Sequence, residues 1–326
     1  MPIDWSPFVA FVQSHQRFLI MTHVRPDGDA LGSEIGLASA LRQLGKSVRV
    51  VVASNLGPRY EFLDTATTPV ERFRPPGDDF RNADAIVIVD TGTWNQLGEF
   101  GPFMQSMDVG KAVIDHHRTQ DDLGGIRFVD TTVEAAGRLI YDATVALGVP
   151  VTAEAANALF MALATDTGWF RHSSTGPRTF DLARELVQAG ANPTRIYDAI
   201  FDQSTLGRMR LIGRALDRMT AEAGGRIVHT EVYLADYEET GAIPPDTEDL
   251  INYPRGVTGV EIALVFIEQA AGGTKVSFRG KEPIDVGRLA EQFGGGGHQM
   301  ASGATVMKSV ADTRVAVLAA ARAALP

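Results

Sequence analysis

Residues 17–44 read RFLIMTHVRPDGDALGSEIGLASALRQL, and this stretch decides the fold. Its apolar start, 17–24, has the length of a buried strand and ends in a polar loop. From Ala30 to Leu44 the apolar residues recur at helical spacing, until Gly45 ends the pattern. A strand, a loop and a helix in this order predict the first unit of an α/β sheet.

The same alternation continues along the chain and predicts a doubly wound domain. Three further runs rich in Val and Ile, at 47–53, 85–89 and 111–114, have the composition of strands that are buried on both faces of a parallel sheet. Helical patterns follow at 134–147 and 153–164. In such a sheet, ligands bind at the carboxyl ends of the strands.

A second, smaller α/β domain is predicted for the C-terminal part of the chain. Runs at 227–233, 259–267 and 274–279 have strand character, and 309–325 has helical spacing. The length of 326 residues also exceeds the size at which a chain usually folds around a single hydrophobic core. The expected organisation is a mainly parallel first domain at 1–190, a helical connector at 191–220 and a smaller α/β domain at 221–326.

The composition excludes several kinds of site. The chain contains no cysteine, so disulfides, thiolate metal sites and cysteine nucleophiles are excluded, and metal ligands must be His, Asp or Glu. A formal net charge of −10 argues against a broad basic face for duplex nucleic acid, so a phosphate-bearing ligand must be held locally. Residues 1–14 lack a signal-peptide pattern, and no run has the roughly 18 apolar residues of a membrane helix. We therefore expect a cytoplasmic protein without a membrane partner.

Four polar clusters are predicted to meet at the carboxyl edge of the first sheet. They are 23–29 (HVRPDGD), Asp90, 115–117 (DHH) and Asp166. Each has an ordinary explanation when taken alone, since an Asp after a strand is commonly a cap or turn residue and a single His is more often structural. Together, these acidic groups and two or three imidazoles at one edge would repel one another unless cations neutralised them.

These residues carry a resemblance to the DHH phosphoesterase superfamily. Asp115, His116 and His117 match the motif that gives the superfamily its name, and residues 23–29 match the His-x-x-x-Asp-x-Asp pattern before it. The resemblance extends over nearly the whole chain, through segments 90–92 (DTG), 165–168 (TDTG), 278–280 (FRG) and 294–298 (GGGGH). The last two resemble the signature of the family's associated C-terminal domain.

The resemblance implies a pair of divalent metal ions with Asp90 as the bridging ligand. One ion would be held by His23, Asp27 and Asp90, and the other by Asp29, Asp90, His116 and Asp166. Mixed carboxylate and imidazole ligands favour Mn²⁺ over Mg²⁺, although Zn²⁺ or Co²⁺ could substitute. Two such ions would activate a water and clamp the attacking and leaving oxygens, so that no protein nucleophile is required.

The remaining residues of the DHH motif are expected to assist the reaction. Neighbouring residues of an extended chain point to opposite faces, so at most one of His116 and His117 is expected to bind a given ion. Asp115 would orient an imidazole or fix the loop. His117 would stabilise the scissile phosphate or protonate the leaving oxygen, with a packed or surface histidine as the alternative. Arg118 is a candidate phosphate contact, and an ordinary surface arginine is an equal alternative.

The glycine run of the second domain is a candidate substrate site. Four consecutive glycines, Gly294, Gly295, Gly296 and Gly297, lose much backbone entropy on folding, and close approach of backbone N–H groups to an anion is the functional explanation. A flexible turn is the alternative. With Arg279 and His298, the run is expected to bind a phosphate and a base and to face the metals across an interdomain cleft, and Ser302 is expected to continue this surface.

A compact DHH domain followed by this C-terminal domain is most similar to the nano-RNase and phosphoadenosine-phosphate (pAp) phosphatase group. This resemblance implies hydrolysis of short single-stranded oligonucleotides and of the 3′-phosphate of pAp, and it suggests a homodimer. A phosphodiesterase for cyclic dinucleotides such as c-di-AMP, or for their linear products, is a close alternative. A RecJ-like exonuclease is less favoured, because such proteins carry additional nucleic-acid-binding domains. A catalytically silent nucleotide sensor would lack at least one ligand, and none is missing here.

Overall fold

The chain forms two compact units, and the computed structural model describes residues 3–63 and 67–326. The first unit is Met1–Gln203 and the second is Ser204–Pro326. Helix α7 (Pro193–Phe201) belongs to the first unit and helix α8 (Leu206–Asp217) to the second. The structure therefore divides the stretch 191–220, which the sequence predicts as a separate connector, between the two units.

A parallel sheet forms the centre of the first unit, with the strand order β3-β2-β1-β4-β5-β6. Its strands are β1 (Arg17–Met21), β2 (Ser47–Val52), β3 (Val70–Arg72), β4 (Ala85–Val89), β5 (Gly110–Asp115) and β6 (Ile126–Val129). From β1 the chain first proceeds outward to β3, and it then returns to place β4 on the other side of β1. The carboxyl ends of β1 and β4 therefore flank the topological switch point, where ligands bind in open α/β sheets.

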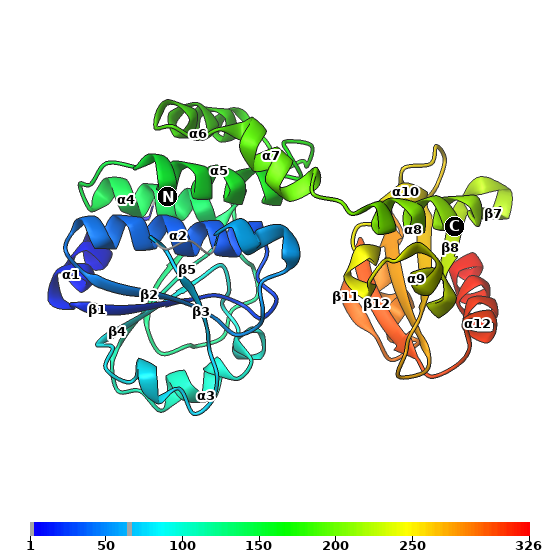
Figure 1. Cartoon of the computed structure of the whole chain (residues 1–326), viewed down its shortest axis with the longest axis horizontal. Coiled ribbons are helices and arrows are strands. Elements are labelled where there is room, and N and C mark those ends of the chain that lie inside the picture. The colour runs from blue at the N-terminus through cyan, green and yellow to red at the C-terminus, as the bar shows by residue number, and fades with distance from the viewer. Residues whose placement is uncertain (1–2, 64–66) are drawn as a thin grey trace. The chain divides into compact units, whose positions relative to one another are not determined.

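Helices cover both faces of this sheet, as the doubly wound prediction requires (Figure 1). One face carries α1 (Ser6–Ser14), α2 (Gly28–Gln43), α4 (Ala136–Ala146) and α5 (Ala153–Asp166), and α6 (Pro177–Gln188) lies beyond α5; the other face carries α3 (Phe100–Gln105). Successive strand residues alternate between the two cores, since Ile20 packs on the α2 side and Met21 on the α3 side. The sheet and its helices are thus held by two separate apolar layers.

Helix α2 approaches α5 closely through glycine. A Cβ atom on Gly32 would lie 2.3 Å from the carbonyl oxygen of Ala158, and one on Gly36 would lie 2.6 Å from a methyl carbon of Leu159. Gly28 occupies the same face, directly against Thr165. This close packing fixes the start of α2, where Asp27 and Asp29 lie, against the end of α5, where Asp166 lies.

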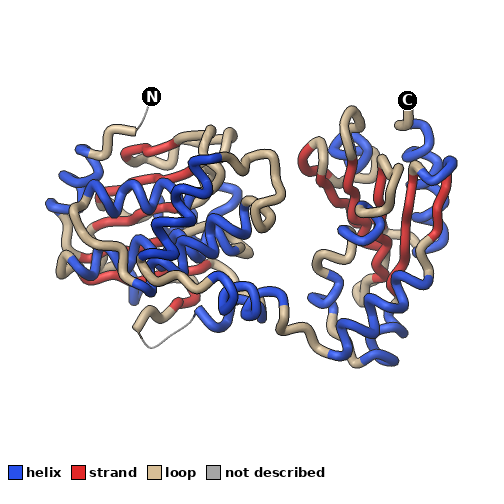
Figure 2. Tube along the Cα trace, turned by 90° about the horizontal axis from the view of Figure 1, so that it is seen from above, coloured by secondary structure: helices blue, strands red, loops and turns tan. Residues whose placement is uncertain are grey.

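The second unit is built on a mixed sheet with the strand order β11-β12-β10-β9-β8-β7, in which β8 and β9 are parallel and the other pairings antiparallel. Its strands are β7 (Thr220–Glu222), β8 (Ile227–Val232), β9 (Ile262–Glu268), β10 (Thr274–Gly280), β11 (Gly296–His298) and β12 (Ala301–Val306). Its helices, besides α8, are α9 (Leu234–Thr240), α10 (Asn252–Arg255), α11 (Val286–Glu291) and α12 (Val310–Ala323). Figure 2 shows that helices accompany the strands of each unit.

The predicted α/β class is confirmed, and each of the predicted strands and helices is present with ends shifted by a few residues. The sequence did not predict the edge strands β3 and β6 of the first sheet, the edge strands β7 and β11 of the second, or β12, which lies beside β11. Among the described residues, no helix combines the length and the apolar composition needed to cross a lipid bilayer.

Candidate metal centre

The loop between β1 and α2 brings the first candidate ligands together. Asp27 is the N-cap of α2, and its Oδ1 accepts hydrogen bonds from the backbone N–H groups of Asp29 and Ala30, both at 3.1 Å. The ring of His23 contacts the carbonyl oxygen of Val24 through Nδ1 at 3.0 Å. Its Nε2 is thereby directed to the carboxylates, 3.9 Å from Asp27 Oδ1 and 3.6 Å from Asp90 Oδ2.

Asp90 lies at the centre of the arrangement. It follows β4 directly, and its backbone N–H extends the pairing with β5 by donating to the carbonyl of Ile114 at 3.0 Å. Its φ of 57° lies in the left-handed region, which costs a non-glycine residue about 1–3 kcal/mol and is typical of functional sites. The side chain is 2 % exposed, and its Oδ1 accepts no hydrogen bond from the described residues. A cation is the kind of partner that such a buried, unsatisfied oxygen lacks.

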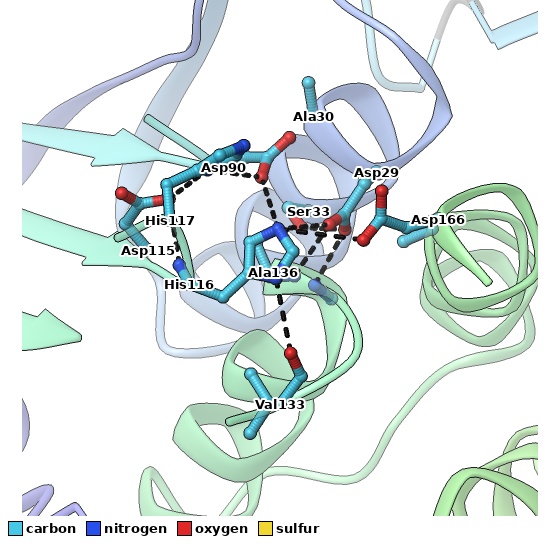
Figure 3. A network of polar contacts seen from close by, with 12 residues as sticks. Asp29, Ala30, Ser33, Asp90, Asp115, His116, His117, Val133, Ala136 and Asp166 are labelled. Atoms are coloured by element: carbon cyan, nitrogen blue, oxygen red, sulfur yellow. Dashed lines mark hydrogen bonds and ion pairs between the residues drawn. The ribbon is translucent and has the colours of Figure 1, made fainter. Parts of the chain in front are cut away.

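His116 joins Asp90 to the second group of candidate ligands (Figure 3). Its Nε2 lies 3.4 Å from Asp90 Oδ1, 3.6 Å from Asp29 Oδ2 and 3.7 Å from Asp166 Oδ2. Its Nδ1 lies 3.4 Å from the carbonyl oxygen of Val133, on the far side of the ring. This orientation is typical of metal-binding histidines, in which one nitrogen binds the ion and the other a backbone carbonyl.

Asp29 is held by the start of helix α4. Its Oδ2 accepts a hydrogen bond from the backbone N–H of Ala136 at 2.7 Å, and its Oδ1 one from Gly137 at 2.9 Å. The N-cap of α4 is Ala135, whose side chain cannot accept these hydrogen bonds. The carboxylate of Asp29 therefore caps α4 from a distance, and the positive end of the helix dipole stabilises its charge.

The side chain of Asp115 organises the DHH motif. It is buried, and its Oδ1 accepts the backbone N–H of His116 and contacts Nδ1 of His117, both at 2.8 Å, while its Oδ2 accepts from Gln120. The sequence predicts that at most one of His116 and His117 serves a given ion, on the premise of an extended chain. Strand β5 ends at Asp115, and both rings approach Asp90 Oδ1, His116 through Nε2 at 3.4 Å and His117 through Nδ1 at 3.7 Å. Both imidazoles could therefore contribute to one group of ligand atoms.

The electrostatics of the protein alone show an excess of buried negative charge. Burial and the neighbouring carboxylates of Asp90 and Asp166 raise the pKa of Asp29 well above its usual range, and burial with Asp90 raises the pKa of Asp166 to about 6. Burial would lower the pKa of His23 and His116, but hydrogen bonding to Asp90 and the surrounding carboxylates raise it to about 9 and about 10. Retained protons thus supply the positive charge that cations would provide.

The residues present fit divalent cations. Three groups of ligand atoms each lie within 4.8 Å of one another: His23, Asp27 and Asp90; Asp29, His116 and Asp166; and Asp90, His116 and His117. Carboxylate oxygens with imidazole nitrogens are donors suited to Mn²⁺, Zn²⁺ and related ions. The six residues that the sequence predicts as metal ligands therefore meet at one edge of the sheet, and each lies in at least one group.

The predicted substrate-binding residues are placed in different surroundings. Arg118 is exposed beside the DHH motif. Arg279 is half-buried on β10, and its pKa is lowered by burial and by the neighbouring Arg255, which the sequence analysis did not single out. The side chain of His298 falls outside the described part of the chain, and its backbone belongs to β11. Ser302 is buried, and its hydroxyl donates to the carbonyl of Val286 at 2.6 Å, which gives it a structural use.

At three of the four positions of the glycine run, backbone geometry or close packing explains why the residue is glycine. Gly294 has a φ of 72°, and a Cβ on Gly295 would lie 2.1 Å from the carbonyl oxygen of Gly303. Gly297 has a φ of 145° and lies against Ser302 of β12. At Gly296 a Cβ would meet no described atom within 4 Å. The β11–β12 hairpin therefore explains most of a pattern that sequence reasoning assigned to ligand binding.

Two further features of the site were missed by sequence reasoning. Glu34 of α2 is fully buried, and neither of its carboxyl oxygens has a hydrogen-bond partner among the described residues. Its position as the only charged residue between Asp29 and Arg42 was a usable signal. The second feature is the start of α4, which holds the carboxylate of Asp29. The sequence contains no comparable signal for it, because the contacts join segments more than a hundred residues apart.

A parallel sheet whose switch point carries this set of carboxylates and imidazoles can hold divalent cations, and the family and relatives that this chain matches make it a metal-dependent phosphoesterase. The DHH family model for the N-terminal domain matches residues 17–164, and the DHHA1 domain model matches residues 224–325. The chain belongs to the DHH family.

Comparison with known proteins supports this assignment in sequence and in structure. The chain is 32 % identical to the bifunctional oligoribonuclease and PAP phosphatase NrnA of Thermus thermophilus, over 88 % of this chain and 83 % of that protein. An exopolyphosphatase-related protein from Bacteroides fragilis superposes with a TM-score of 0.90 at 23 % identity, covering 96 % of this chain and 95 % of that one. The exonuclease RecJ bound to manganese superposes with a TM-score of 0.56 at 15 % identity, over 100 % of this chain and 96 % of that one. These two structures share the fold.

Proposed function

We propose that this protein hydrolyses short oligonucleotides and the 3′-phosphate of pAp with two divalent cations, Mn²⁺ foremost. The observation that carries the proposal is the position of Asp90, whose two oxygens approach His23 at 3.6 Å and His116 at 3.4 Å. A carboxylate between two groups of donors suits a bridging ligand. The similarity to NrnA of Thermus thermophilus, a bifunctional oligoribonuclease and PAP phosphatase, supports the substrate class.

The contacts between these residues suggest which of them would hold each cation. His23, Asp27 and Asp90 would hold one, and Asp29, His116 and Asp166 the other, with Asp90 joined to the second group through its contact with His116. When bound, such ions supply a water nucleophile at neutral pH and stabilise charge on the attacking and leaving oxygens. The carboxylates of Asp29 and Asp90 are buried and held in fixed positions, whereas those of Asp27 and Asp166 are open to solvent and could be reached by substrate.

His117 would assist the phosphate group from the protein side. Its Nδ1 contacts the buried carboxylate of Asp115 at 2.8 Å, which stabilises the protonated ring and raises the pKa of His117. A charged imidazole in this position can stabilise the phosphate oxygens or give its proton to the leaving oxygen. Asp115 would then fix the orientation of the ring.

The second unit would bind the rest of a short substrate. Arg279 and Arg255 lie close enough for their charges to interact, and a phosphate would relieve that repulsion. The backbone of the glycine run and His298 stay part of the proposed surface, with Gly296 the position least explained by packing, whereas the buried hydroxyl of Ser302 does not. The net charge of −10 disfavours long nucleic-acid strands, which need an extended basic track.

The cytoplasmic location and the homodimer stay predictions.

The experiment that tests this proposal compares substrates with Mn²⁺-loaded protein. We expect rapid hydrolysis of a dinucleotide and of pAp, slow hydrolysis of a strand of about 24 nucleotides, and no more than weak hydrolysis of pyrophosphate. Preference for c-di-AMP would select the cyclic-dinucleotide alternative. Faster hydrolysis of the long strand than of the dinucleotide, or hydrolysis of pyrophosphate alone, would contradict the proposal.

A further inference from the structure

A buried ion pair lies directly beside the segment that holds two candidate metal ligands. Glu134 and Arg138 are each 6 % exposed. The guanidinium of Arg138 binds the carboxylate of Glu134 through two nitrogens. Its Nε lies 3.0 Å from Oε1 and 2.8 Å from Oε2, and its Nη2 lies 2.6 Å from Oε1. That terminal nitrogen also donates to the carbonyl of Arg178 at 2.6 Å, next to the start of α6.

Stability alone is a poor explanation for this pair. Removing two charges from water is costly, and well-packed apolar side chains of similar volume commonly serve as well or better. The pair also does not supply an N-cap, since the cap of α4 is Ala135 and the first N–H groups are taken by Asp29. A bidentate contact between Arg138 and Glu134 has a fixed geometry, so it holds the backbone segments that it connects in one relative position.

The backbone between the two charges contacts both ligands. The carbonyl of Val133 lies 3.4 Å from His116 Nδ1, one residue before Glu134. The N–H groups of Ala136 and Gly137 hold both oxygens of Asp29, just before Arg138. A Cβ on Gly137 would lie 2.6 Å from the side chain of Ala162 in α5, so this segment has little room to shift. A displacement would move the supports of His116 and Asp29 together.

We propose that Glu134 and Arg138 are positioning residues for the cation held by Asp29, His116 and Asp166. The pair clamps the segment 133–138 to the start of α6, and the segment in turn sets the direction of the imidazole and of the carboxylate. This inference rests on the proposed function, because it assumes that this group binds a cation. Among the described residues, the hydrogen bonds between Glu134, Arg138 and Arg178 do not reach His23, Asp27 or Asp90, so we expect the affinity of that group to change little.

The test measures Mn²⁺ binding to the full chain by electron paramagnetic resonance of the free ion, together with thermal unfolding of the metal-free protein. The main variant is Glu134→Leu/Arg138→Met, which replaces the pair by apolar side chains, and its thermal unfolding shows whether the fold is kept. We expect one Mn²⁺ site to weaken by about 10–100-fold, the usual effect of removing outer partners of metal ligands, while the other keeps its affinity. Arg138→Lys keeps the charge but loses the fork, and we expect a smaller weakening of the same site.

A control in the same unit is the less buried pair Arg49 and Glu71, which joins β2 to β3 with Nε–Oε1 at 2.7 Å. Arg49→Met/Glu71→Leu should leave both Mn²⁺ affinities unchanged. If folded Arg138→Lys or the double variant binds both ions as the wild type does, the positioning role is overturned. Equal weakening of both sites, or weakening that follows the loss of thermal stability in the control pair too, also overturns it. Failure of the wild type to bind Mn²⁺ would instead overturn the proposed function.

Discussion

At the scale of single residues, the proposed metal centre depends on Asp90. This buried carboxylate follows a central strand, has a left-handed backbone and approaches His23 and His116 with different oxygens. Strained backbone and an unsatisfied buried oxygen both cost stability, and both are expected where a site is organised for a ligand that the protein alone does not supply.

Replacing Asp90 should therefore be far more damaging than replacing Arg118, which is exposed. We expect Asp90→Ala to lower kcat/KM for a dinucleotide by more than about 100-fold, and Arg118→Ala by less than about tenfold, because a bridging ligand serves both cations. Steady-state hydrolysis with saturating Mn²⁺ measures both. Losses of similar size would contradict the bridging role.

Glu34 should make stability depend on pH in a defined direction. Burial and the charge of Asp90 raise its pKa well above the ordinary value of 4.5, so the folded state keeps a proton that the unfolded state releases. Stability is then lost as pH rises above about 4.5, with a slope of at most about 1.4 kcal/mol per pH unit. Glu34→Gln removes this loss.

The measurement is denaturant unfolding of metal-free wild type and Glu34→Gln at several pH values. The two proteins should have similar stability near pH 4, and the variant should become increasingly more stable toward neutral pH. A constant difference across this range would show that Glu34 titrates normally in the folded protein.

The sequence alone identifies the residues that follow strands, because an Asp or His at the carboxyl end of a buried run is visible in the pattern. His23, Asp90 and the DHH motif were found in this way. The support of Asp29 by Ala136 and Gly137 could not be found, since the contacts cross more than a hundred residues of chain. The direction of His117 could not be found either, because it depends on where β5 ends.

At the scale of elements, helix α2 carries ligands only because it packs closely on α5. Gly28, Gly32 and Gly36 form one face of α2, and side chains there would collide with Thr165, Ala158 or Leu159. This packing brings Asp29 of α2 near Asp166 of α5, with His116 Nε2 within 3.7 Å of a carboxylate oxygen of each.

A methyl group at Gly32 should push these helices apart. We expect Gly32→Ala to destabilise the protein by about 1–3 kcal/mol, because the new atom would meet a backbone carbonyl that cannot rotate away. Gly213→Ala in α8 is the control, since a Cβ there meets no described atom within 4 Å and alanine favours a helix by about 1 kcal/mol. Denaturant unfolding should give opposite signs for the two variants. Equal effects would show that the α2–α5 contact tolerates a side chain.

Element prediction from the sequence succeeded for the buried strands and failed at the sheet edges. Central strands such as β4 (AIVIV) are apolar throughout because both faces are covered. The edge strands β3 (VER) and β11 (GGH) are three residues long and carry no such pattern. Their pairing is decided by neighbouring strands, which a local pattern does not contain.

At the scale of the whole molecule, the chain consists of two units with separate cores. Ligands of the candidate metal centre all come from the first unit. Added Mn²⁺ should therefore stabilise that unit alone, by about 2.7 kcal/mol for each bound ion at a concentration one hundred times its dissociation constant.

Calorimetry of the full chain with and without Mn²⁺ tests this expectation. We expect two unfolding transitions, of which one moves to higher temperature with Mn²⁺ while the other stays in place. Movement of both transitions together would show that the units unfold as one body.

The most direct test of the central claim is anomalous diffraction at the manganese absorption edge from crystals grown with Mn²⁺. The account predicts two peaks that share Asp90, one beside His23 and Asp27 and the other beside Asp29, His116 and Asp166. Absence of manganese from these side chains, or peaks located only elsewhere on the protein, would contradict it.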